Sequence, residues 1–172
     1  MSTDDSDEFP CPPGTFTDGT GRTVDVSPFE DADRSALVAF YDAFDPADQA
    51  QGLPPRTTAA VESWLADICG EGVHTVARHG DRVVGHACLV PARDDWHELA
   101  IFVASAYQQA GIGTRLLRYL LGQGGAAGVG RVWLVVHPNN VVAKRLYESA
   151  DFERTGDGVE LGATEIKMQR RL

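Results

Sequence analysis

The chain has 172 residues, of which 43% are hydrophobic and 8% aromatic, a composition typical of one globular domain with a buried core. Its formal net charge of −10 argues against a nucleic-acid partner, because binding a phosphate backbone requires clustered Lys and Arg. No apolar run is long enough to span a membrane, and the acidic N-terminus lacks a signal-peptide pattern, so we expect a cytoplasmic protein.

Residues 1–21 are rich in Asp, Pro, Gly and Thr, which predicts a flexible acidic tail ahead of one domain over residues 22–172. Lysine occurs only at positions 144 and 167, against thirteen arginines. An acid surplus with so little lysine resembles proteins of salt-loving microbes, although a GC-rich genome would also favour arginine. The three cysteines, Cys11, Cys69 and Cys88, are widely spaced without a CxxC, and therefore predict neither a disulfide framework nor a metal site.

Hydrophobic periodicity predicts alternating strands and helices along the chain. In chain order we expect a strand over 22–26, helices over 29–44 and 58–68 separated by an irregular loop, strands over 73–78, 83–90 and 97–103, a helix over 111–121, a strand over 131–136, a helix over 140–150 and a strand over 165–170. This order predicts a single α/β domain with a mixed sheet.

The stretch from Val103 to Leu121 reads as the end of a strand, a tight glycine turn and the start of a helix. A helix N-terminus stabilises an anion, and glycines let the backbone approach a phosphate closely. On this stretch alone, a purely structural turn remains an open alternative. A dinucleotide fingerprint is excluded because Leu116 replaces its third glycine, and no P-loop sequence is present. Likewise Ile101 replaces the second histidine of a zincin motif, His97-Glu98-x-x-His.

The run Gln108-x-x-Gly111-x-Gly113 at this corner resembles the acetyl-CoA motif of the GNAT-type N-acetyltransferases. A later segment is similar to the second motif of that family, with matching residues at Asn140, Ala143, Leu146, Tyr147, Glu148 and Phe152. The resemblance covers residues 22–172. It implies a GNAT-like single domain with a mostly antiparallel sheet of about six to seven strands, splayed at the acetyl-CoA site, and about four helices on its two faces.

The resemblance implies acetyl-CoA as co-substrate and no metal. It implies cofactor contacts from Phe102, Val103, Gln108, Gln109, Ala110, Gly111, Ile112, Gly113, Thr114, Asn140 and Tyr147. Corner N–H groups would hold the pyrophosphate, and the pantetheine arm would lie like a short strand between the strands that end near Val103 and Val136. Asn140 could equally be an ordinary helix N-cap. The corner lacks a basic side chain, for which Arg115 and Arg118 would partly compensate.

The implied reaction is direct attack of a primary amine on the thioester in a ternary complex. By resemblance, Tyr147 is the acid that protonates the leaving sulfur; the alternative is a core aromatic residue. Glu98 and His97 are candidates for the base, but they point to opposite faces of a strand, so at most one is well placed. Either could instead be a surface residue. His86 is a further candidate, with a structural histidine as the alternative reading.

The resemblance leaves open whether the amine belongs to a small molecule or to a protein, and a homodimer is compatible with it. We expect the acceptor between the two N-terminal helices, the loop over 45–58 and the last strand. Asp42, Asp45 and Asp48 would suit a cationic amine, or they are simply solvated. Asp151 stands where the family usually has glycine, at a helix end that favours the left-handed conformation. Two other functions stay open: a non-catalytic acyl-CoA sensor, and an interaction module that uses the acidic tail.

Overall fold

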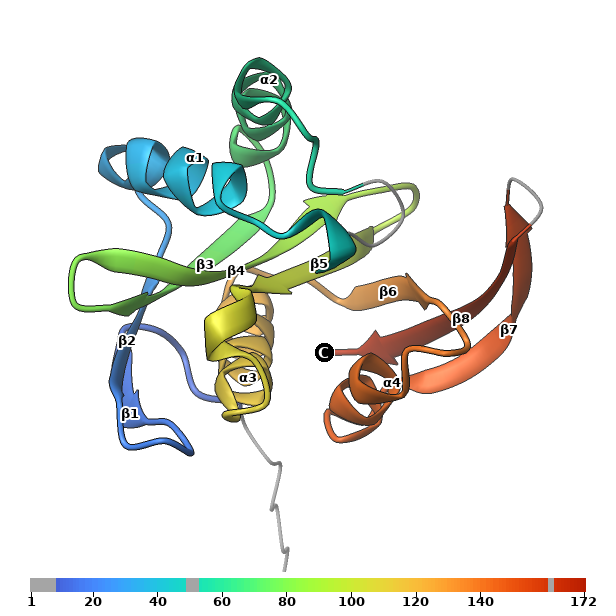
Figure 1. The fold of residues 1–172 in the computed structure, drawn as a ribbon. Coiled ribbons are helices and arrows are strands. Elements are labelled where there is room, and N and C mark those ends of the chain that lie inside the picture. The colour runs from blue at the N-terminus through green and yellow to red at the C-terminus, as the bar shows by residue number, and fades with distance from the viewer. Residues whose placement is uncertain (1–8, 49–52, 161–162) are drawn as a thin grey trace, which may run out of the picture.

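The computed structural model describes residues 9–48, 53–160 and 163–172. Its strands form one eight-stranded sheet in the order β1-β2-β3-β4-β5-β6-β8-β7, in which only the β5–β6 pair is parallel (Figure 1). The strands are β1 (Gly14–Thr17), β2 (Thr23–Pro28), β3 (Val73–His79), β4 (Arg82–Pro91), β5 (Trp96–Val103), β6 (Arg131–Val136), β7 (Glu153–Glu160) and β8 (Ala163–Arg171). The predicted mixed α/β, mostly antiparallel fold is confirmed, with eight strands instead of six to seven.

Within the described ranges, four α-helices pack on the two faces of this sheet. They are α1 (Arg34–Asp42), α2 (Thr58–Cys69), α3 (Ile112–Ala126) and α4 (Val141–Glu148), and short 3-10 turns lie at η1 (Asp31–Asp33), η2 (Pro46–Asp48) and η3 (Ser105–Tyr107). Helices α1 and α2 lie above the central strands in Figure 1 and α3 lies below them. Among the described residues, no helix is long and apolar enough to cross a membrane.

Two hydrophobic clusters fill the space between these helices and the sheet, one on each face. The cluster under α1 and α2 is built around Leu37, Tyr41, Leu65 and Phe102, and the cluster around α3 contains the leucines of its buried side. Central strands therefore bury side chains on both faces, as in β4, where seven consecutive residues from position 83 are buried.

The N-terminal part of the domain differs from the sequence prediction in two places. Residues 14–17, assigned to a flexible tail, form β1, which pairs antiparallel with β2. Residues 1–8 lie outside the described part of the chain. The first helix begins at Arg34 rather than at residue 29, because Glu30 and Asp33 cap each other and start a 3-10 turn at Asp31.

Strands β5 and β6 are paired only at their starts, where residues 96–98 lie beside residues 131–133. Beyond that point β5 pairs with β4 alone and β6 with β8 alone, so the two strands diverge (Figure 1). The edges of β5 and β6 that face each other therefore form a wedge in the middle of the sheet, at the position where the sequence predicts a splay.

Candidate functional site

The corner between β5 and α3 adopts a conformation that aims backbone N–H groups outward. Gln109 and Gly111 both have positive φ, at 56° and 82°, and Gly111 is the N-cap of α3. The first intrahelical bond runs from the N–H of Arg115 to the carbonyl of Gly111, which leaves the N–H groups of residues 112–114 without an intrahelical acceptor. Together with the helix dipole, these groups make the corner an anion site.

The side chain of Gln108 is turned toward protein partners instead of a ligand. Its Nε2 donates to the carbonyl of Val103 at 3.0 Å and to Oδ2 of Asp48 at 3.2 Å, and the hydroxyl of Ser105 donates to the same carboxylate oxygen at 2.5 Å. Sequence reasoning missed this contact, because Asp48 is sixty positions away along the chain. Its carboxylate is therefore engaged at the corner, whereas Asp42 is exposed.

Some of the other corner residues are buried in the core, and others are exposed. Ala110 and Ile112 are buried with exposed fractions of 7% and 1%, and anchor the turn in the core. Gly111 and Thr114 are exposed, and Gly113 lies against the side chains of Val103 and Leu146, so that a Cβ there would sit 3.8 Å from each. The corner thus touches both β5 and α4.

The backbone of β5 presents alternate peptide groups to the wedge. The N–H of Ala104 donates to the carbonyl of Val84 in β4. Because peptide groups alternate sides along a strand, Phe102 also directs its N–H and C=O toward β4, while Val103 and Ile101 direct theirs toward β6. Of the two strand residues expected to meet the cofactor, the geometry therefore favours Val103; the Phe102 ring packs on the opposite side, under α1 and α2.

Helix α4 brings the second group of expected site residues to the other side of the wedge. Asn140 caps the helix, since its Oδ1 accepts from the N–H of Ala143 at 3.0 Å. Tyr147 is 8% exposed and packs edge-on against Phe152, and its hydroxyl makes no hydrogen bond within the described residues. Burial raises the pKa of Tyr147 to about 12, so the phenol keeps its proton at neutral pH.

Just after α4, Asp151 has φ 57°, the left-handed conformation predicted for this position. Its neighbour Phe152 is buried at 4% exposed and donates its backbone N–H to the carbonyl of Tyr147. The left-handed turn therefore ends the helix and returns the chain to the core.

The two candidate bases lie on opposite faces of β5, as expected. Glu98 shares its face with Ala100 and Phe102, which pack under α1 and α2, whereas His97 shares its face with Leu99 on the α3 side. Glu98 is exposed, while Nδ1 of His97 is buried without a hydrogen-bond partner among the described residues. Glu98 thus faces the side on which the acceptor is expected, and His97 does not.

His86 belongs to a buried hydrogen-bonded chain that sequence reasoning only partly anticipated. Its Nδ1 contacts the hydroxyl of Tyr41 at 2.5 Å, and its Nε2 contacts Nδ1 of His74 at 3.2 Å. His74 Nε2 lies 2.8 Å from the carbonyl of Ile68 and 3.0 Å from that of Glu71. Carbonyls only accept, so His74 carries its proton on Nε2, His86 donates from Nε2, and Tyr41 donates to His86. His86 is therefore a structural histidine with both ring nitrogens satisfied.

Cys88 lies beside this pair, with its sulfur within 4.8 Å of the ligand nitrogens of His74 and His86. The two ring planes differ by 9° and the ring centroids are 5.4 Å apart, a separation that requires the two nitrogens to face each other almost in line. Their lone pair and proton point at each other and do not converge on a third point. The geometry fits a hydrogen bond, not a shared metal ion.

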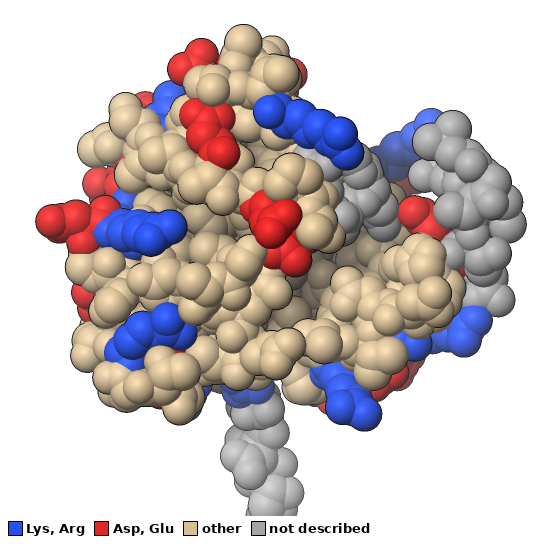
Figure 2. All heavy atoms as spheres, in the orientation of Figure 1, with Lys and Arg blue, Asp and Glu red and all other residues tan. Residues whose placement is uncertain are grey.

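The basic side chains expected to help the corner bind an anion are directed elsewhere. Figure 2 shows separate Lys and Arg side chains scattered over the face in view, and acidic side chains at its upper and left edges and near its centre. The guanidinium carbons of Arg115 and Arg118 lie 5.7 Å and 5.0 Å from the ring centroids of Phe16 and Phe9. Both arginines thus pack on the N-terminal segment, which weakens the expectation that they compensate for the missing basic residue.

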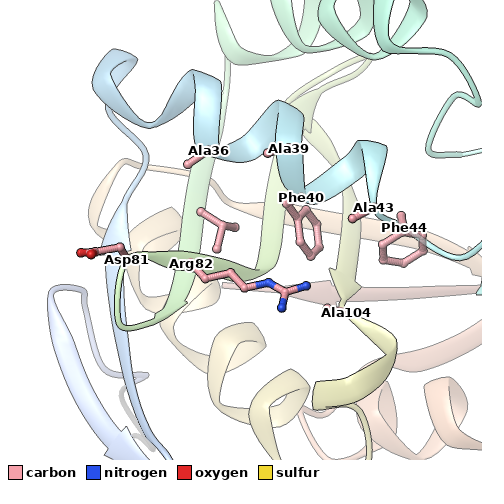
Figure 3. Close-up of a pocket in the computed structure, with 9 residues that line it drawn as sticks. Ala36, Ala39, Phe40, Ala43, Phe44, Asp81, Arg82 and Ala104 are labelled. Atoms are coloured by element: carbon pink, nitrogen blue, oxygen red, sulfur yellow. The ribbon is translucent and has the colours of Figure 1, made fainter.

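A separate cavity of about 160 Å³ lies between α1 and the start of β4 (Figure 3). Ala36, Ala39 and Phe40 of α1, with Ala43 and Phe44 just after the helix, form its roof. The Arg82 guanidinium extends beneath them toward Ala104. The same guanidinium lies 6.0 Å from the ring centroid of Tyr107, and it forms no ion pair with the described residues. It is a positive charge close to the corner that makes no hydrogen bond to it.

Comparison with known proteins gives one family. The model of the acetyltransferase (GNAT) family matches residues 35–152. Two similar curated proteins are mycothiol acetyltransferase of Nocardia farcinica, 38% identical over 115 residues, and [ribosomal protein bS18]-alanine N-acetyltransferase of Haemophilus ducreyi, 30% identical over 74 residues. These matches cover 66% and 43% of this chain but only 34% and 51% of the relatives. The chain therefore spans a third to about half of the length of these two proteins.

Solved structures share the fold over nearly the whole chain. The GNAT domain of S. lividans PAT has a TM-score of 0.77 at 20% identity, covering 92% of this chain and 96% of that one. The ribosomal-protein-alanine N-acetyltransferase of Brucella melitensis has a TM-score of 0.71 at 25% identity, covering 86% and 99%. Salmonella typhimurium yncA, solved with its cofactor acetyl-CoA, has a TM-score of 0.69 at 20% identity, covering 86% and 93%.

Proposed function

This chain belongs to the GNAT family of acetyltransferases, and from that premise we propose that it transfers an acetyl group from acetyl-CoA to a primary amine. The observation that carries the proposal is the corner that follows β5, where positive φ at Gln109 and Gly111 starts α3 and leaves the N–H groups of residues 112–114 without an intrahelical acceptor, next to the β5–β6 wedge. The pyrophosphate binds these N–H groups, and the pantetheine arm pairs with the peptide groups of Ile101 and Val103 along the edge of β5.

In the proposed reaction the amine attacks the thioester carbonyl, and coenzyme A leaves as a thiolate that takes a proton. A backbone N–H on the wedge edge of β5 stabilises the oxyanion. Tyr147 supplies the proton to sulfur, supported by its position on α4 beside the wedge and by a hydroxyl that makes no hydrogen bond within the described residues. Because burial raises the pKa of Tyr147 to about 12, the phenol holds its proton until the thiolate forms. Glu98, on the α1–α2 face, takes the proton from the amine, directly or through a water molecule.

The cofactor assignment is tested by calorimetric titration with acetyl-CoA, with NAD and ATP as controls. We expect binding of acetyl-CoA alone. Repeating the titration at about 2 M salt tests salt adaptation, since screening at that strength shortens the reach of charges to a few ångströms and a backbone site should lose little affinity. If acetyl-CoA binds neither in the first titration nor at about 2 M salt, the proposed function is refuted.

The catalytic roles are tested by substitution. Tyr147→Phe should lower kcat by about 10²-fold or more while the Kd for acetyl-CoA stays within about twofold. Glu98→Gln should lower kcat about 10²-fold, whereas the matched variant His97→Gln on the opposite face of β5 should leave kcat within about twofold. A protein that binds acetyl-CoA but acetylates no amine would be an acyl-CoA sensor instead. The amine panel should include N-terminal alanine peptides and amines related to mycothiol, after the two named relatives.

A further inference from the structure

The turn between β1 and β2, residues 18–22, is organised around a buried carboxylate. The side chain of Asp18 is fully buried, and it accepts hydrogen bonds from the backbone N–H and hydroxyl of Thr20, from the backbone N–H of Arg22 and from Nε of Arg22, at 2.7–3.0 Å. Burial opposes the charge, but the hydrogen bonds from Arg22 and Thr20 outweigh it and hold the pKa of Asp18 below its usual range. The turn is therefore held in one conformation, with the Arg22 side chain fixed.

This turn is attached to the backbone of the corner at two points. The N–H of Gly19 donates to the carbonyl of Ala110 at 2.8 Å, and Nη1 of Arg22 donates to the carbonyl of Ala106 at 3.1 Å. Glycine favours the first contact, because a Cβ at position 19 would lie 3.3 Å from the Ala110 oxygen, a tight approach that would push the two backbones slightly apart. The two carbonyls flank Tyr107, Gln108 and Gln109, so the turn is hydrogen-bonded to the backbone at both ends of this segment.

The side chain of Tyr107 also holds this segment in place, through contacts with Arg22 and His79. The guanidinium carbon of Arg22 lies 4.1 Å from the centroid of the Tyr107 ring, a cation–π contact. The Tyr107 hydroxyl contacts Nδ1 of His79 at 3.0 Å, and the residue is 8% exposed. Arg22 thus combines three contacts, with Asp18, with the Tyr107 ring and with the Ala106 carbonyl.

A corner of this kind needs such support because its conformation is costly. The left-handed backbone at Gln109, with φ 56°, is unfavourable for a residue with a Cβ, and Gln109 immediately precedes Ala110. The corner also lacks a basic side chain of its own, so anion binding relies on the directions of its N–H groups. Contacts that hold these directions before the ligand arrives raise affinity, because less ordering is left to the binding step.

We propose that the β1–β2 turn is the positioning element of the cofactor corner, with Asp18 and Arg22 as its positioning residues. The proposal rests on the proposed function for its ligand. This turn lies outside residues 35–152, the region matched by the family. Its residues 18–21 belong to the segment that the sequence assigns to a tail, and Arg22 is the first residue of the predicted domain. Arg22 acts through the backbone of residues 106–110 and does not touch the ligand.

The test compares Arg22→Met with Arg82→Met. Both variants remove a guanidinium close to the Tyr107 ring, but only Arg22 bonds to the corner backbone. We expect Arg22→Met to raise the Kd and the KM for acetyl-CoA about tenfold or more, while kcat at saturating acetyl-CoA stays within about twofold. Arg82→Met should change both constants by less than about twofold. Arg22→Lys keeps the positive charge but loses the planar guanidinium, which bonds Asp18 and the Ala106 carbonyl at the same time. This variant should therefore behave like Arg22→Met.

A second readout needs no ligand. Amide hydrogen exchange of residues 108–114 in the free protein should become faster in Arg22→Met and stay unchanged in Arg82→Met. Should Arg22→Met not fold, Arg22→Lys and Gly19→Ala carry the same comparison. Equal weakening of acetyl-CoA binding by the Arg22 and Arg82 variants would overturn the proposal in favour of a general charge effect. Unchanged exchange and affinity in the Arg22 variants would also overturn it. If the wild type does not bind acetyl-CoA, the proposed function fails, and hydrogen exchange alone still decides whether the turn holds the corner.

Discussion

The buried histidine pair makes the stability of the fold depend on pH. Burial, and secondarily the neighbouring His74, lowers the pKa of His86 to about 3 from its usual 6.5. The unfolded chain takes up a proton near pH 6.5, whereas the folded chain excludes it until about pH 3. Stability is therefore fully present above pH 6.5 and is lost as the pH falls through that window.

The size of the effect follows from the width of this window. One pKa unit corresponds to about 1.4 kcal/mol, so a change from pH 7 to pH 5, which crosses about 1.5 units of the window, removes about 2 kcal/mol. The full window corresponds to roughly 5 kcal/mol. Burial also lowers the pKa of His74, which adds to the loss in the same direction. Asp18 does not contribute at pH 5–7, because its pKa lies below the usual carboxyl value.

The assay is urea unfolding of the wild type and of His86→Gln at pH 7 and pH 5. A glutamine amide can accept from Tyr41 and donate to His74, but it does not titrate in this range. We expect the difference in unfolding free energy between the two pH values to shrink by about 2 kcal/mol in His86→Gln. His137→Gln removes an exposed histidine and should keep the wild-type difference. A His86→Gln protein with the full wild-type difference would refute the reasoning.

Three further predictions concern single positions. Gly111→Ala forces a Cβ into φ 82°, and should lower the unfolding free energy by about 1 kcal/mol and weaken calorimetric binding of acetyl-CoA. Its control, Gly125→Ala in open space on α3, should instead raise the unfolding free energy by about 0.5–1 kcal/mol. Asn140→Ala removes the cap of α4 and should cost about 1 kcal/mol, measured as a lower Tm. Asp151→Ala should cost about 1 kcal/mol at φ 57°, whereas Asp151→Gly should not, as urea midpoints will show.

The sequence predicts the interior of the sheet better than its edges. Strands β2 to β6 and all four helices have an apolar pattern because they bury one or both faces, and that pattern is readable. The two strands that were missed, β1 and β7, are the two edges of the sheet. Each has a single neighbouring strand, and β7 contains two glycines and four charged residues, so its strand conformation comes from backbone pairing with β8.

The candidate site shows the same division between local and long-range information. The glycine corner, the helix cap at Asn140 and the left-handed Asp151 depend on neighbouring residues, and were predicted. The contact of Asp48 with Gln108, and the attachment of the turn at Asp18 to the corner, join segments far apart in the chain. Nothing in the local sequence identifies those partners. Side-chain alternation did predict that Glu98 and His97 face opposite ways, but only the helices above β5 decide which face receives the acceptor.

The pairing between β5 and β6 is the shortest strand pairing among the described residues. Strands β6, β8 and β7 join the rest of the sheet through only these three residue pairs, between residues 96–98 of β5 and residues 131–133 of β6. Tyr147 lies on α4, the helix that follows the end of β6 at which β6 no longer pairs with β5. The side chain of Leu146 lies 3.8 Å from the position that a Cβ of Gly113 would take, so α4 also approaches the corner across the wedge. A substitution at Val132 should therefore change the distance between the phenol and the β5 backbone without touching either of them.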